Sequence, residues 1–164
     1  LRYVNPFLAG TLSLTLGKIR AMLLSILHQL RKPIMQYSVA VNNARLDAIE
    51  STIGTGALLL IFTGTKPADC ATADSGTLLA TLTLPSDWMA TASSASKLKA
   101  GTWSGTGSSA GVAGHFRIKD SGGTVCGIQG TCGEGSGELS LDNTDITVSQ
   151  AISVSAFTIN AANT

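Results

Sequence analysis

Few residues in this sequence could carry out acid–base or nucleophilic chemistry. Its two histidines are His28 and His115, and His115 falls on the polar side of an expected strand, which predicts a solvent-exposed imidazole. Residues 107–111 (GSSAG) match the G-x-S-x-G pattern of a nucleophile elbow, but that pattern needs a strand before the serine and a helix after it. Here a Gly/Ser-rich loop leads directly into an expected strand. Because no nucleophile–base pair can be named, we predict that the protein is not an enzyme and has no catalytic residue.

The three cysteines, Cys70, Cys126 and Cys132, do not form a recognisable metal site. A zinc site needs about four ligands, and no second cysteine pair or histidine stands at zinc spacing. An odd number of cysteines also argues against a complete set of disulfides. Two interpretations stay open: three reduced thiols, which we favour, or a link between Cys126 and Cys132 across a hairpin.

Two pairs of acidic residues, Glu134/Glu138 and Asp142/Asp145, lie in or beside expected turns. Such pairs could line a calcium site or act as the two carboxylates of a glycosidase. Ordinary turn chemistry, in which short polar side chains bind their own backbone, is the favoured interpretation. The sequence therefore predicts no metal and no cofactor.

The two tryptophans allow a binding function without catalysis. If exposed, they could form a platform on which sugar rings stack; if buried, they are the large residues of a core built mainly from small ones. Trp88 follows an expected strand end and is predicted to be buried, whereas Trp103 is equally compatible with either state. Trp103 is therefore the candidate glycan contact of the alternative function, a carbohydrate- or receptor-binding module.

Composition excludes some partners and indicates the fold class. The formal net charge of the 164 residues is +1 and only 13% of them are charged, so no nucleic-acid partner is predicted. Gly, Ala, Ser and Thr are abundant, and apolar residues are frequent enough to exclude a disordered chain. This balance is typical of tightly turned β proteins.

Residues 1–34 differ from the rest of the chain. They contain five basic residues and no acidic one. From Leu12 to Leu30, a leucine or isoleucine recurs at spacings that alternate between four and three residues. The segment is interpreted as a coiled-coil or partner-docking helix, a basic membrane-surface helix, a signal segment, or an over-extended gene start before Met35. It has no apolar run long enough to span a membrane, and no membrane partner is predicted.

Residues 35–56 are predicted to form a docking helix and a hinge. The helix is expected over residues 42–53, capped by Asn42 or Asn43, with Gly54 just after its end. Its apolar side chains share one face, which must pack on the protein's own sheet, on copies of the chain or on a partner. The predicted partner-docking residues are Val39, Leu46, Ile49 and Ile53.

From residue 57 the hydrophobic period changes from helical to alternating. Segments such as 57–63, 78–84, 113–119 and 152–159 read as strands separated by Gly, Pro and Asp turns. About eight short strands with turns every 8–12 residues are typical of sandwiches and barrels. We therefore predict that residues 57–164 form a mainly β domain, an antiparallel, jelly-roll-like β-sandwich.

Over residues 35–164 the sequence resembles a family of small virion structural proteins of tailed bacteriophages and prophages. The resemblance rests on the stretches YSVAVNNARLDAIESTIG (37–54), LPSDWM (84–89), GTW (101–103), AGHFRI (113–118), LSLDN (139–143) and AFTI (156–159). It implies a viral protein located in the virion, of the capsid-decoration or tail-associated type, bound to the major capsid or tail protein. Copies are expected to form a homo-oligomer, a trimer being one option.

Overall fold

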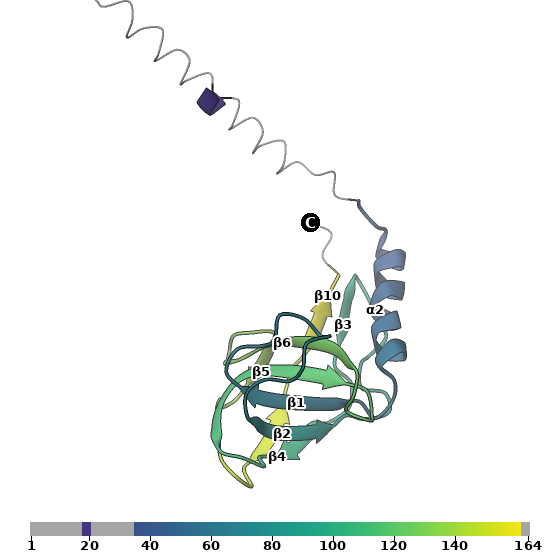
Figure 1. Cartoon of the computed structure of the whole chain (residues 1–164). Helices are drawn as coiled ribbons and strands as arrows, with labels where there is room; N and C mark the ends of the chain where they lie inside the picture. The colour runs from purple at the N-terminus through teal and green to yellow at the C-terminus, as the bar shows by residue number, and fades with distance from the viewer. Residues whose placement is uncertain (1–17, 21–34, 162–164) are drawn as a thin grey trace, which may run out of the picture. The chain divides into compact units, whose positions relative to one another are not determined.

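The structure is a computed structural model that describes residues 18–20 and 35–161. Residues 18–20 are helical, and the other predictions for the segment 1–34 lie outside the described residues. The helix and all ten strands described below belong to one compact unit, Tyr37–Asn163. The described part of this unit is thus mainly β with one helix before the strands, as the sequence predicts (Figure 1).

Helix α2 spans Val39–Ile53 and begins earlier than predicted. Its N-cap is Ser38, whose Oγ accepts a hydrogen bond from the backbone N–H of Val41 at 3.3 Å. The predicted caps were wrong because Asn42 is fully buried within the helix and Asn43 contacts the β domain. At the other end, Gly54 has a φ of 93° and its N–H bonds to the carbonyl of Glu50, so the predicted helix end is confirmed.

The main sheet curls into a half-barrel with the strand order β2-β1-β5-β6-β7, and β8 pairs with β5 beside this path. Its strands are β1 (Leu58–Thr63), β2 (Leu78–Thr83), β5 (Gly111–Lys119), β6 (Cys126–Glu134), β7 (Leu139–Leu141) and β8 (Asp145–Ile146). All pairs are antiparallel except β6 and β7, which run parallel, so the prediction of a purely antiparallel fold was wrong. Gly135 and Gly137, with φ values of 60° and 77°, let the chain double back within residues 135–138.

Two small sheets complete the domain, β4 (Trp103–Thr106) with β9 (Ala151–Val154) and β3 (Ser96–Leu98) with β10 (Thr158–Asn160). The strand expected over 152–159 is divided, because Phe157 turns into the core and its two halves pair with different partners. Strand β3 is short and polar, and no alternating apolar pattern marks it in the sequence. Residues 35–161 therefore form ten strands where about eight were expected.

One hydrophobic core joins the main sheet to the small sheets. A row of aromatic rings crosses it, with centroid separations of 6.0 Å for Trp88–Trp103, 5.3 Å for Trp103–Phe157 and 5.8 Å for Phe157–Phe116. Each of these side chains is at least 95% buried. Such contacts stabilise a core beyond the area they remove from water, which compensates for the many small residues of this chain.

Candidate functional site

Three polar side chains attach α2 to the β domain. Asn43, Asp47 and Glu50 are spaced four and three residues apart, so they lie on one side of the helix. Their oxygens accept hydrogen bonds from the backbone N–H groups of Ala95, Ala92 and Met89, each at 2.9 Å. The helix and the segment 89–95 run in opposite directions. The three backbone N–H groups of this segment therefore meet the three side chains at regular intervals along the helix. We call these three side chains the helix clamp.

Lys97 of β3 forms ion pairs with two residues of the helix clamp. Its Nζ lies 2.8 Å from Asp47 Oδ1 and 3.2 Å from Glu50 Oε2, and it donates to the carbonyl of Ala90 at 2.9 Å. Burial alone would lower the pKa of Lys97, but hydrogen bonds with Asp47 and Glu50 outweigh this effect and the pKa is raised. The lysine therefore stays charged at neutral pH.

The hydrophobic residues of α2 divide into two groups. Leu46 is 4% exposed, and Ile49 and Ile53 pack against the protein's own core, so these three predicted docking residues are used within the chain. Val39 is 54% exposed, and Val41, two positions further along the first turn, is 44% exposed. The exposed aliphatic side chains of α2 are therefore at its N-terminal end, near Tyr37.

Trp103 is fully buried, and so is Trp88. The indole Nε1 of Trp103 donates to the carbonyl of Ala100 at 3.0 Å, and that of Trp88 donates to the carbonyl of Gly54 at 3.1 Å. A buried ring with a satisfied N–H cannot stack on a sugar. The prediction that Trp103 contacts a glycan is corrected accordingly: the ring packs between Trp88 and Phe157 in the core, and the carbohydrate-binding alternative loses its main basis.

The outer face of strands β1 and β5 is covered by the loop formed by residues 64–76, which we call the cover loop. The carbonyl oxygen of Gly64 lies 3.1 Å from Nδ1 of His115. Gln129 Nε2 donates a hydrogen bond to the carbonyl of Pro67 at 2.9 Å. His115 is fully buried and stacks on Phe62, with ring centroids 5.2 Å apart. The prediction of a solvent-exposed His115 was wrong, because alternation along a strand does not reveal that a loop covers its polar face.

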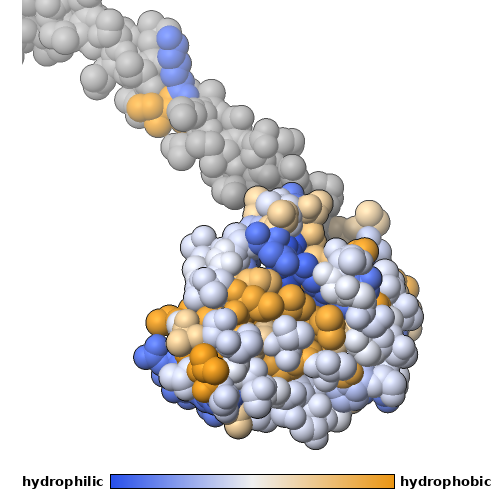
Figure 2. Space-filling view, turned by 60° about the horizontal axis from the view of Figure 1, so that its bottom comes forward, coloured by the Kyte–Doolittle hydropathy of each residue, from blue (hydrophilic) through white to orange (hydrophobic). Residues whose placement is uncertain are grey.

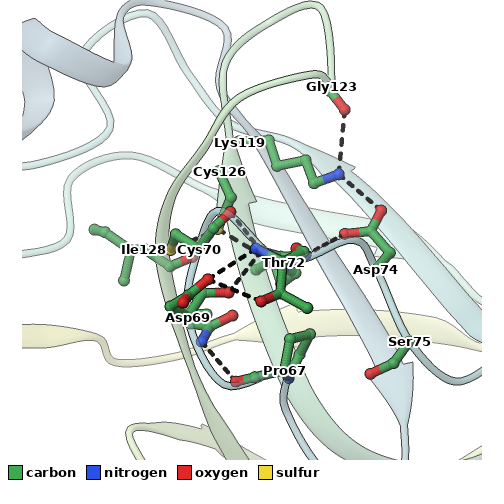
Figure 3. Close-up of polar contacts among 12 residues, drawn as sticks. Pro67, Asp69, Cys70, Thr72, Asp74, Ser75, Lys119, Gly123, Cys126 and Ile128 are labelled. Carbon is green, nitrogen blue, oxygen red and sulfur yellow. Dashed lines mark hydrogen bonds and ion pairs between the residues drawn. The ribbon is translucent and has the colours of Figure 1, made fainter.

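Arg117 of β5 organises the cover loop, whose residues Cys70, Thr72 and Asp74 are labelled in Figure 3. Its side chain is 1% exposed, and its guanidinium donates to the carbonyls of Thr72 and Cys70, each at 2.9 Å. It also pairs with Asp74 at 2.6 Å and approaches Cys126 Sγ with its Nε at 3.3 Å. A planar guanidinium can satisfy several acceptors at once, so this one side chain ties the loop to β5 and β6.

Lys119 and two acidic residues of the cover loop, Asp69 and Asp74, surround Arg117, and we call these four residues the arginine cluster. Lys119 Nζ lies 2.7 Å from Asp74 Oδ2. Partial burial raises the pKa of Asp74, but hydrogen bonds from Lys119 and Arg117 outweigh it and hold the pKa below its usual 3.8. Asp69 accepts bonds from the hydroxyl and N–H of Thr72, which lower its pKa as well. The two cations thus share the carboxylate of Asp74, whereas the carboxylate of Asp69 binds within the loop.

The remaining candidates from the sequence occupy structural positions. Ser108 of the GSSAG segment donates its hydroxyl to the carbonyl of Leu79 at 3.1 Å, and β5 rather than a helix follows. Glu138 accepts from the N–H and hydroxyl of Thr131, and Glu134 accepts from those of Thr144. Within residues 18–20 and 35–161, no group of three or more His, Cys, Asp and Glu side chains could hold a metal ion.

Comparison with family models, with curated proteins and with solved structures finds no match to this chain. In the part of the chain that the structure describes, no helix has the length and apolar character needed to cross a membrane.

The helix clamp and the arginine cluster are both formed by residues distant in sequence. Regular spacing of Asn43, Asp47 and Glu50 was the one signal in the sequence that could have indicated the clamp.

Proposed function

We propose that this protein is a non-enzymatic structural component of a bacteriophage virion, either a capsid decoration protein or a tail-associated protein. The sequence resemblance over residues 35–164 supports this class. The observation that carries the proposed mode of attachment is the division of α2 into an anchored part and an exposed apolar end. Copies of the chain would form a homo-oligomer on the particle, and the half-barrel with its small sheets would act as a jelly-roll-like sandwich facing outward.

Attachment through α2 requires a helix that cannot swing away from its domain. The helix clamp, Lys97 and the Trp88–Gly54 bond provide this rigidity, because each is formed between α2 or its end and the segment 88–97. Preorganisation reduces the entropy lost on binding. Val39 and Val41 lie on different sides of the first turn, so a capsid or tail protein would have to enclose this end of the helix to contact both.

A contact through the sheet surface is the second part of the proposed attachment. Figure 2 shows apolar residues gathered on one face of the β domain, with polar residues around them. Contiguous apolar surface bounded by polar residues is typical of protein interaction sites. Together with the end of α2, such a surface would bind the particle without covalent chemistry.

The test is incorporation into particles. A double variant, V39D/V41D, places charges at two exposed positions, so its folding should be unaffected. We expect at least tenfold fewer copies per particle, measured by quantitative mass spectrometry on density-purified virions. The matched control is V125D, at a valine that is 65% exposed in the turn before β6. Absence of the natural chain from purified particles would overturn the virion proposal, and equal incorporation of the two variants would overturn attachment through α2.

A further inference from the structure

The sulfur atoms of Cys70 and Cys126 are neighbours across the arginine cluster. Their Sγ atoms lie 2.8 Å apart, although the two residues are 56 positions apart in sequence. A disulfide has a sulfur–sulfur distance of about 2.04 Å, so the two atoms need to approach by only about 0.8 Å. Cys70 belongs to the cover loop and Cys126 begins β6, so a bond between them would join a loop to the main sheet.

The surrounding structure holds both cysteines in place. Arg117 donates to the carbonyl of Cys70 and to the sulfur of Cys126, so one buried guanidinium fixes the position of each. The thiol of Cys126 also contacts the carbonyl of Ile128 at 3.3 Å. Both cysteines are half-buried rather than sealed in the core, so a small oxidant can reach them.

The alternative pairing of Cys126 with Cys132 does not fit the folded chain. Both residues lie in β6, six positions apart on one extended strand. At about 3.3 Å per residue their Cα atoms are about 20 Å apart, whereas a disulfide requires less than about 7 Å. Cys132 packs against the hydrophobic core instead.

We propose that Cys70 and Cys126 form a disulfide under oxidising conditions and that this bond locks the cover loop onto β6. Oxidised glutathione serves as the co-reactant. One cysteine thiolate attacks its disulfide and releases the first glutathione thiol, forming a mixed disulfide. The second cysteine sulfur then displaces the other glutathione. The protein loses two protons and two electrons, and one oxidised glutathione becomes two glutathione thiols.

A locked cover loop changes stability as well as connectivity. A cross-link between residues this far apart restricts the unfolded chain more than it restricts the folded one. We expect the melting temperature of the oxidised protein to exceed that of the reduced protein by about 5–10 °C. Such a bond would suit a protein assembled in a reducing cytoplasm and later released from the cell, but the inference does not depend on the virion proposal.

Peptide mapping tests the pairing directly. The full chain is equilibrated with a series of reduced and oxidised glutathione mixtures, free thiols are blocked with N-ethylmaleimide, and the unreduced protein is digested with trypsin. Cleavage after Arg45, Lys97 and Lys119 places Cys70 in residues 46–97, and both Cys126 and Cys132 in residues 120–164, because Lys66 precedes proline. We expect the two peptides to be joined.

The controls distinguish the competing outcomes. C132S should form the same cross-linked peptide pair and show the same rise in melting temperature, whereas C70S should form neither. If residues 120–164 instead carry an internal disulfide, the pairing is Cys126–Cys132 and the proposal is wrong. Three alkylated cysteines at every glutathione ratio would overturn it equally. Because C132S leaves the pair intact, the test does not depend on whether C70S folds.

Discussion

Lys97 Nζ lies 2.8 Å from Asp47 Oδ1, and the lysine side chain is only 3% exposed although it belongs to a three-residue strand. This contact connects the only described helix of the Tyr37–Asn163 unit to a small sheet of the same unit. Asp47 also accepts the N–H of Ala92. The position of α2 therefore depends on a buried cation as well as on hydrophobic packing.

Replacing Lys97 with methionine should loosen α2. The variant keeps the length of the side chain but leaves Asp47, Glu50 and the carbonyl of Ala90 without their common donor. We expect a loss of about 2–3 kcal/mol in the free energy of unfolding, measured by urea denaturation. The control K66M alters an exposed lysine of the cover loop and should change this value by less than about 0.5 kcal/mol. Equal values for the two variants would show that the ion pairs do not hold the helix.

Arg117 should not be replaceable by lysine. A lysine keeps the positive charge but has one ammonium group, which cannot reach the carbonyls of Thr72 and Cys70 and the carboxylate of Asp74 together. We expect R117K and R117M both to destabilise the domain by about 3 kcal/mol or more, since each leaves buried acceptors unpaired. Hydrogen exchange in residues 65–76 should rise in both. K66M again serves as the control, because Lys66 is an exposed residue of the same loop.

If R117K retained the stability and the slow exchange of the natural protein, the charge alone would hold the cover loop. That result would contradict the importance of the fork geometry. It would also weaken the argument that Arg117 positions both cysteines.

The sequence predicted the mainly β class and several strands well, because alternation is a local property. The expected strands 57–63, 78–84 and 113–119 correspond closely to Leu58–Thr63, Leu78–Thr83 and Gly111–Lys119. The division of the last strand had no such signal, since residues 155–157 contain neither Gly nor Pro. What divides it is the tertiary placement of Phe157 beside Trp103, which overrides the local pattern.

The candidate sites were harder to predict than the strands. Arg117 appeared as one of several polar residues on an outer strand face, and its burial follows from a loop that begins more than 40 positions earlier in the chain. The apolar face of α2 was recognised, but its division between internal packing and exposed surface was not. Periodicity shows that a face must be buried; it does not show which molecule buries it.

Gly114 marks a close approach between β5 and the start of the cover loop. A Cβ atom at this position would collide with the carbonyl oxygen of Gly64. We therefore expect G114A to lower the free energy of unfolding by about 1–3 kcal/mol, because the backbone of β5 or of the loop must shift. G122A is the matched control, since its Cβ would meet nothing closer than 3.6 Å. A neutral effect of G114A in urea denaturation would mean that the cover loop yields without cost.

The thiols of β6 should react slowly at neutral pH and faster as pH rises. Burial, with a contribution from the neighbouring Cys70, raises the pKa of Cys126 to about 11, and burial raises the pKa of Cys132 to about 12. The thiolate is the reactive form, and it is scarce well below these values. Between pH 7 and pH 9 we expect alkylation of Cys126 by iodoacetamide to accelerate about tenfold per pH unit.

The rate at each pH is measured by mass spectrometry of the peptide 120–164, with C132S used to isolate Cys126 and C126S to isolate Cys132. In urea the pH profiles of both cysteines should move toward that of an ordinary thiol, near pKa 9, because unfolding removes their burial. Oxidation by glutathione disulfide should show the same acceleration with pH wherever Cys126 supplies the attacking thiolate. A folded-state rate that levels off by pH 8 would contradict the raised pKa and indicate that Arg117 stabilises the Cys126 thiolate more than burial opposes it.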